Sequence, residues 1–273
     1  MKKYYFLLLP LAFILLIAAT TKKTKKQTCS NPKSAKLITQ TKNGITLTEL
    51  YSPESFSNAK ITQSFGGSSE DLDTNTFSAN YTIENYELGK QTGMSGIKTC
   101  ANSAKGQHIH NIIDNQPYTA LYDLNAKVKA KNDGQHIVLS FLSRSYHESI
   151  KNKNAYTISS TITGASRTVI RYAQPDLTKP MLFYSRPKGE YTGSETDAVL
   201  LDFYLVNCDL SKNGYYVSAE VNGNTFKLTK WCGYFMEGLP KGENTIKLRL
   251  LDKNGKLVDS PFNTSERKII LKK

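Results

Sequence analysis

Residues 81–90, YTIENYELGK, match residues 203–212, FYLVNCDLSK, at an offset of 122 positions. Farther along, Gly134-Gln135-His136 matches Gly242-Glu243-Asn244 at an offset of 108 positions. Self-similarity at this spacing indicates one structural unit that occurs twice. We therefore expect two related domains, residues 44–174 and 180–273, and the chain length of 273 residues allows a separate core in each.

The segments around these matches have the pattern of short strands. ITLTELY (45–51), QHIVLSFL (135–142) and VLLDFYLV (199–206) are rich in β-branched and aromatic residues, and Gly-containing turn pairs separate such runs. No stretch after residue 21 keeps helical periodicity for three turns. The predicted fold class is all-β, with two tandem immunoglobulin-like β-sandwiches after an N-terminal signal or anchor segment.

The positive charge is concentrated at the N-terminus. Residues 1–43 contain nine of the 36 Lys and Arg residues and none of the 23 Asp and Glu residues, so the net charge of +13 falls to +4 for the rest. Nucleic-acid binders concentrate basic residues on their folded surface, and this distribution argues against a nucleic-acid partner.

The N-terminus has the order of an export signal. Two Lys precede an apolar run over 4–20, and small residues occupy its end, at 18–21. We expect residues 1–21 to be a signal peptide or membrane anchor and 22–43 to be a basic linker. The Lys residues just after the run oppose the positive-inside tendency, which favours cleavage over an anchor that attaches the protein to the membrane.

The repeat also predicts where loops meet. The first copy has 14 more residues, about 91–105, before the strand that begins near His108. In the immunoglobulin-like order this insertion joins strands B and C, and residues 143–149 join strands F and G. Those two loops lie at the same end of the fold.

His108 and His110 align with Tyr216 and Ser218, so they should share the outward, exposed face of their strand. Two imidazoles at i and i+2 can ligate one metal ion, Zn or Cu, with His147 or Glu148 as a further ligand. A pair of solvated polar residues remains the alternative.

Two clusters of charged residues are candidate ligand-binding sites. The first is Arg144, His147 and Glu148 in the F–G loop, and the second is Arg186 and Lys188 at the start of the second copy. A solvated loop end is the alternative. No nucleophile motif such as G-x-S-x-G occurs, so no catalytic residue is assigned and an enzyme is unsupported.

The cysteines leave two states open. Cys208 and Cys232 should come to the same end of the second sandwich and are a disulfide candidate. Free buried thiols are the alternative, because a core of this size folds without a bridge. Cys29 and Cys100 are left unpaired.

Several blocks carry a resemblance over roughly 45–272: ENYELGKQTG, NSAKGQHIHNIIDNQPY, LSFLSRSYHESIKN, MLFYSRPKGEY, LLDFYLVNCDLS and YFMEGLPKGENTIKLRLLDKNG. They resemble a family of uncharacterised exported proteins, seen mainly in Bacteroidetes and sometimes labelled phosphopeptide-binding. The resemblance implies a secreted or membrane-attached β protein. The chain departs from the family in lacking a lipoprotein Cys at the expected place and in having Cys208 where relatives have Thr.

The sequence thus predicts an exported binding or interaction protein of the cell envelope, whose partner is a protein, a peptide or an envelope component. An envelope metal-binding protein that uses the His-x-His strand is the alternative, and an enzyme built on the same cluster is the third.

The export prediction has a direct test. Residues 1–45 fused to a reporter that is active only after translocation should give activity outside the cytoplasm, because the order of basic, apolar and small residues directs secretion. A reporter that stays in the cytoplasm would contradict it.

Overall fold

The computed structural model describes residues 37–52, 55–66, 75–94, 97–98, 100–164 and 174–272. Within these ranges the chain is built from strands, with one short 3-10 helix, η3 (Gly193–Thr196). None of the described segments is a helix with the length and apolar character needed to cross a membrane. The expected signal or anchor segment and most of the basic linker lie outside the described residues.

The first sandwich packs a three-stranded sheet, in the order β3-β4-β7, against a four-stranded sheet, in the order β6-β5-β8-β9. Its core joins the two sheets, with Phe77 and Tyr81 from one and Ile109 and Val138 from the other. The strands are β3 (Lys60–Gly66), β4 (Thr76–Glu84), β5 (His108–Ile113), β6 (Thr119–Leu121), β7 (Asn125–Lys129), β8 (Gly134–Ser143) and β9 (Tyr156–Thr163).

The second sandwich repeats this plan. The sheet containing β15-β12-β10 faces the sheet β11-β17-β16-β13-β14, and Phe203 and Phe226 meet in the core between them. Such opposed sheets, linked in this order, are those of an immunoglobulin-like sandwich. The strands are β10 (Met181–Arg186), β11 (Gly189–Tyr191), β12 (Val199–Val206), β13 (Tyr216–Val221), β14 (Asn224–Leu228), β15 (Tyr234–Glu237), β16 (Gly242–Leu251) and β17 (Ser265–Leu271).

The strand bounds confirm the repeat. Strands β5 and β13 begin 108 residues apart, as do β8 and β16, and β4 and β12 end 122 residues apart. The connection from β4 to β5 is longer than that from β12 to β13, as the inserted loop requires. The predicted all-β fold of two sandwiches is therefore confirmed.

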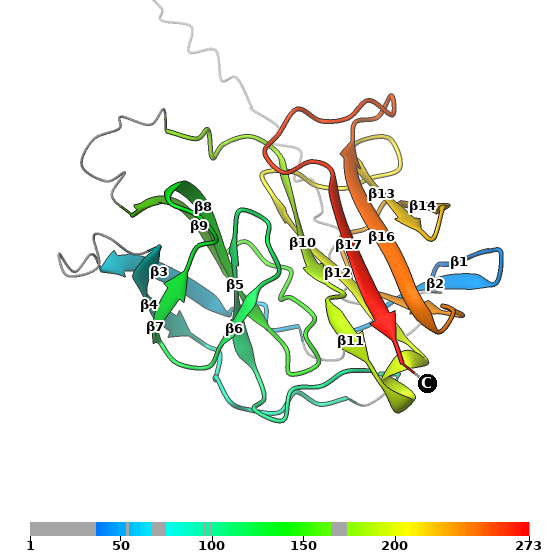
Figure 1. Cartoon of the computed structure of the whole chain (residues 1–273), viewed down its shortest axis with the longest axis horizontal. Coiled ribbons are helices and arrows are strands. Elements are labelled where there is room, and N and C mark those ends of the chain that lie inside the picture. The colour runs from blue at the N-terminus through cyan, green and yellow to red at the C-terminus, as the bar shows by residue number, and fades with distance from the viewer. Residues whose placement is uncertain are drawn as a thin grey trace, which may run out of the picture.

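An N-terminal hairpin belongs to the second sandwich. Strands β1 (Thr39–Lys42) and β2 (Ile45–Glu49) pair with each other, and β2 then pairs with β15. Ile45 and Leu47 enter the second core, and Figure 1 shows the hairpin beside that half of the molecule. The expected first domain, residues 44–174, included residues 45–49. In the structure these residues belong to the second sandwich instead, because β2 pairs with β15.

The two sandwiches pack through the outer face of the β6-β5-β8-β9 sheet (Figure 1). Ile112, Leu139 and Phe141 on that face contact Phe183 and Tyr204, which come from β10 and β12. Strands β8 and β12 are therefore covered on both faces, which explains why their sequences are nearly continuous apolar runs instead of alternating ones.

The docked hairpin generates a stability prediction at Gly238. This residue has φ of 75°, and an added Cβ would lie 2.1 Å from the Gly44 carbonyl oxygen of the hairpin. Gly238→Ala should destabilise the protein by about 3 kcal/mol or more, because the backbone has to move.

Gly223→Ala is the matched control, since Gly223 has φ of 79° with nothing within 4 Å of an added Cβ. Gly223→Ala should lower the free energy of unfolding by only about 1 kcal/mol, because alanine is disfavoured in the left-handed backbone conformation. If chemical denaturation shows the same loss of stability for Gly238→Ala and Gly223→Ala, the close contact between Gly238 and the hairpin is contradicted.

Candidate functional site

Three histidines converge where the first sandwich meets the second. His108 and His110 project from the outer face of β5, because Ile109 and Ile113 between and beyond them pack into the first core. His147 comes from the loop between β8 and β9. The ligand nitrogens of the three rings all lie within 4.8 Å of one another.

The distances are close to those of ligands around one ion. His108 Nε2 lies 2.9 Å from His110 Nε2 and 3.1 Å from His147 Nδ1. A tetrahedral Zn²⁺ with metal–nitrogen bonds of about 2.0–2.1 Å holds its ligand nitrogens about 3.3 Å apart. Two of the three separations are therefore close to this value, and the third, at most 4.8 Å, has to shorten for one metal ion to bind all three nitrogens.

One of the two nitrogen–nitrogen contacts of His108 cannot be a hydrogen bond when the rings are neutral. His108 Nδ1 donates its hydrogen to the Gly106 carbonyl at 2.8 Å, so in the neutral ring Nε2 carries a single lone pair. That lone pair faces two nitrogens and can accept from only one of them. A metal ion accepts lone pairs from all three rings at once.

Burial keeps these imidazoles neutral, which is the state that binds metals. Desolvation lowers the pKa of His108 to about 4 and lowers the pKa values of His110 and His147. The nearby Arg186 and Lys188 act in the same direction.

The expected exposure of the histidine pair is wrong. His108 and His110 do face away from their own core, as the repeat predicts, but both are 0% exposed. The second sandwich covers that face, and Ser185 from β10 reaches His110 Nδ1 at 3.2 Å. An alignment of strands reports which face a residue occupies but not what packs against it.

The third histidine is placed by a tight turn. The His147 amide donates to the Arg144 carbonyl at 2.9 Å, and His147 has φ of 70°. This left-handed conformation is uncommon outside glycine, and residues that adopt it cluster at functional sites. Of the two further ligands expected from the sequence, His147 and Glu148, the structure brings His147 to the pair.

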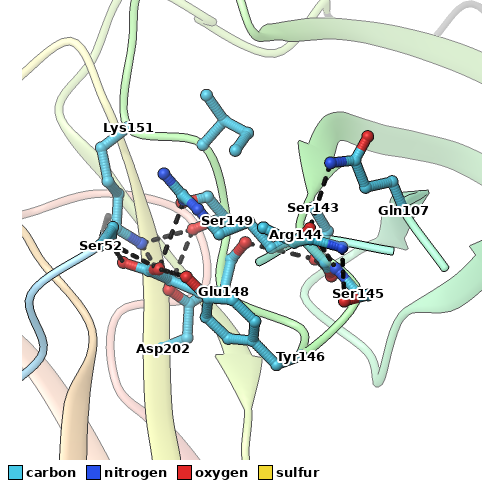
Figure 2. Close-up of polar contacts among 12 residues, drawn as sticks. Ser52, Gln107, Ser143, Arg144, Ser145, Tyr146, Glu148, Ser149, Lys151 and Asp202 are labelled. Carbon is cyan, nitrogen blue, oxygen red and sulfur yellow. Dashed lines mark hydrogen bonds and ion pairs between the residues drawn. The ribbon is translucent and has the colours of Figure 1, made fainter. Parts of the chain in front are cut away.

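Arg144 and Glu148 have a different environment. They form a buried ion pair at 3.3 Å, and the Glu148 carboxylate also accepts hydrogen bonds from Ser52 at 2.6 Å and Tyr146 at 3.0 Å. Figure 2 shows this network between the two sandwiches. The alternative of a solvated loop end is therefore wrong for Arg144 and Glu148, which are 3% and 1% exposed. The ligand-binding role predicted for this cluster stays a prediction.

A second buried ion pair adjoins this network (Figure 2). Lys151 Nζ lies 2.5 Å from Asp202 Oδ1, and Ser149 donates to the same oxygen at 3.0 Å. Lys151 belongs to the first sandwich and Asp202 to β12 of the second, so the pair fixes the relative position of the domains.

Arg186 and Lys188 lie next to the histidines. Both approach Tyr118, whose ring stacks on His110 with centroids 3.5 Å apart. Desolvation, with Arg186 and Arg267 contributing, lowers the pKa of Lys188 to about 8. Sequence reasoning assigned Tyr118 no role, because its only signal was its alignment with Phe226.

The disulfide candidate is not formed, since Cys208 and Cys232 are free thiols, as is Cys100. Cys232 is buried in the second core and Cys208 packs at the edge of it. Burial raises the pKa of Cys208 to about 12, so this thiol stays protonated. Cys29 lies outside the described residues.

Comparison with known proteins finds distant structural similarity only. No protein-family model and no curated protein matches the chain. Fibronectin(III)-like modules of Clostridium thermocellum CbhA match at 14% identity and a TM-score of 0.27, covering 34% of this chain and 97% of theirs. The two tandem V-type regions of VCBP3, a v-region-containing chitin binding protein, match at 8% identity and a TM-score of 0.23, covering 78% and 100%. The fold assignment therefore depends on the strand pairing of this chain.

The Lys151–Asp202 pair generates a prediction. Lys151→Met should destabilise the protein by about 3–5 kcal/mol, because it leaves a buried carboxylate without its counter-charge. Adding Asp202→Asn to this variant should recover part of the loss. Chemical denaturation measures both, and a loss below about 1 kcal/mol in the single variant would contradict the pairing.

Proposed function

We propose that this chain is an exported binding protein of the cell envelope whose ligand is a transition-metal ion, Zn²⁺ or copper, held by His108, His110 and His147. The proposal depends on the convergence of three imidazole nitrogens. His108 Nε2 lies 2.9 Å from the His110 nitrogen and 3.1 Å from the His147 nitrogen. Imidazole is a preferred ligand of both metals. The order of basic, apolar and small residues at the N-terminus supports export.

The surroundings of the ligands support metal binding as well. The Gly106 carbonyl accepts from His108 Nδ1, and the Ser185 hydroxyl contacts His110 Nδ1. Metal-binding histidines almost always use their second nitrogen in this way, which fixes the ring and directs the other lone pair at the ion. The two contacts come from different sandwiches, so domain docking orients the ligands.

The burial of the ligands favours binding over catalysis. Catalytic metal sites keep an open coordination position for substrate, whereas structural sites are closed. His108 and His110 are 0% exposed, and only His147 of the three is partly accessible. We therefore assign the site to metal binding and not to an enzyme.

Titration of tag-free protein with Zn²⁺ and Cu²⁺ tests the proposal. Calorimetry should show one ion bound per chain, and His147→Asn should weaken binding by about 100-fold or more, since it removes a direct ligand. Asn tolerates the left-handed conformation at this position, so the variant should fold.

His136→Gln is the matched control. His136 is a buried histidine of the same sandwich, but it contacts Asp114 at 2.6 Å and Thr163 at 2.9 Å and takes no part in the triad. The metal affinity of the His136→Gln variant should equal that of the unmodified protein. No binding at micromolar metal, or equal affinity in the two variants, would overturn the proposed function.

A further inference from the structure

A tyrosine oxygen lies beside the three histidine nitrogens. Tyr118 Oη is 3.2 Å from His147 Nδ1, which is the nitrogen that faces the triad. The Tyr118 ring lies parallel to His110, with an interplanar angle of 10°. Tyr118 is 3% exposed, so packing holds its oxygen in this position.

Burial raises the pKa of the Tyr118 hydroxyl, and the nearby Arg186 acts against that rise. Lys188 Nζ lies 3.7 Å from the ring centroid and Arg186 Cζ lies 5.4 Å from it. No carboxylate in the described part of the chain forms an ion pair with either cation. A divalent ion at the triad would add two further positive charges to a largely buried region, and an anionic ligand offsets that repulsion.

A tetrahedral site needs one donor beyond the three imidazoles. Phenol oxygen can fill that position once it loses its proton, as metal ligands do. From its place next to His147, Tyr118 Oη needs only a short movement to reach an ion bound by the triad.

We infer that Tyr118 is the fourth ligand of the centre, bound through its phenolate oxygen. The inference depends on the proposed metal-binding function. On binding, a metal–oxygen bond replaces the O–H bond of Tyr118, and the proton passes to solvent. Arg186 and Lys188 then serve as counter-charges to the phenolate and are not ligand-binding residues in their own right.

Tyr122 provides a matched control. Its ring centroid lies 5.1 Å from that of His108, so it is also next to the triad. Its hydroxyl, however, pairs with Ser103 Oγ at 2.6 Å. Tyr122 should therefore make no bond to the metal.

Visible absorption of the Cu²⁺-loaded full chain tests the assignment. Unmodified protein and Tyr122→Phe should both show a phenolate-to-copper charge-transfer band, and Tyr118→Phe should lack it. Tyr118→Phe should still bind copper through the histidines, with affinity reduced by about 10-fold. Resonance Raman excitation within the band of the unmodified protein should show phenolate ring modes, so the result does not depend on the folding of a variant.

The possible failures are distinguishable. Copper binding without a charge-transfer band, or a band that persists in Tyr118→Phe, would overturn the Tyr118 assignment and leave the histidine site standing. Failure of the unmodified protein to bind copper or zinc would overturn the proposed function, and the fourth ligand with it.

Discussion

Packing of the outer sheet face of the first sandwich against β10 and β12 of the second is the interaction on which the rest of this structure depends. It excludes water from a surface that a lone sandwich would expose. Once dry, every polar group there needs a partner, since an unpaired buried charge costs about 3–5 kcal/mol. The Arg144–Glu148 pair and the Lys151–Asp202 pair meet that requirement with protein groups.

The histidine triad meets the need for buried partners in a different way. His108, His110 and His147 present three nitrogens to one region, where His108 Nε2 can accept a hydrogen bond from only one of its two nitrogen neighbours. The ligands come from the first sandwich, and Ser185, Arg186 and Lys188 of the second contact them or their neighbour Tyr118. The metal site we propose is therefore a property of the docked pair of domains, and binding should stabilise their relative position through linkage.

Sequence periodicity and the internal repeat predicted the strands, the sandwich fold and the face of β5 that carries His108 and His110. They also predicted that the inserted loop meets the F–G loop, where the amides of Ser103 and Thr92 donate to the Ser145 carbonyl and hydroxyl. They did not predict burial, because the alternation of a strand reports its own core and not a second domain. The near-continuous apolar runs of β8 and β12 were the signal that both faces are covered. The pairing of β2 with β15 was not predicted either, because the two strands are far apart in the sequence and no pattern within one strand indicates its partner.

Anomalous diffraction at the zinc absorption edge, from crystals of zinc-loaded protein, would locate the ion between the two sandwiches. We expect one peak there, about 2.0–2.1 Å from His108 Nε2, His110 Nε2 and His147 Nδ1. Fully occupied zinc elsewhere on the chain, with the three rings still in contact and no peak among them, would contradict it.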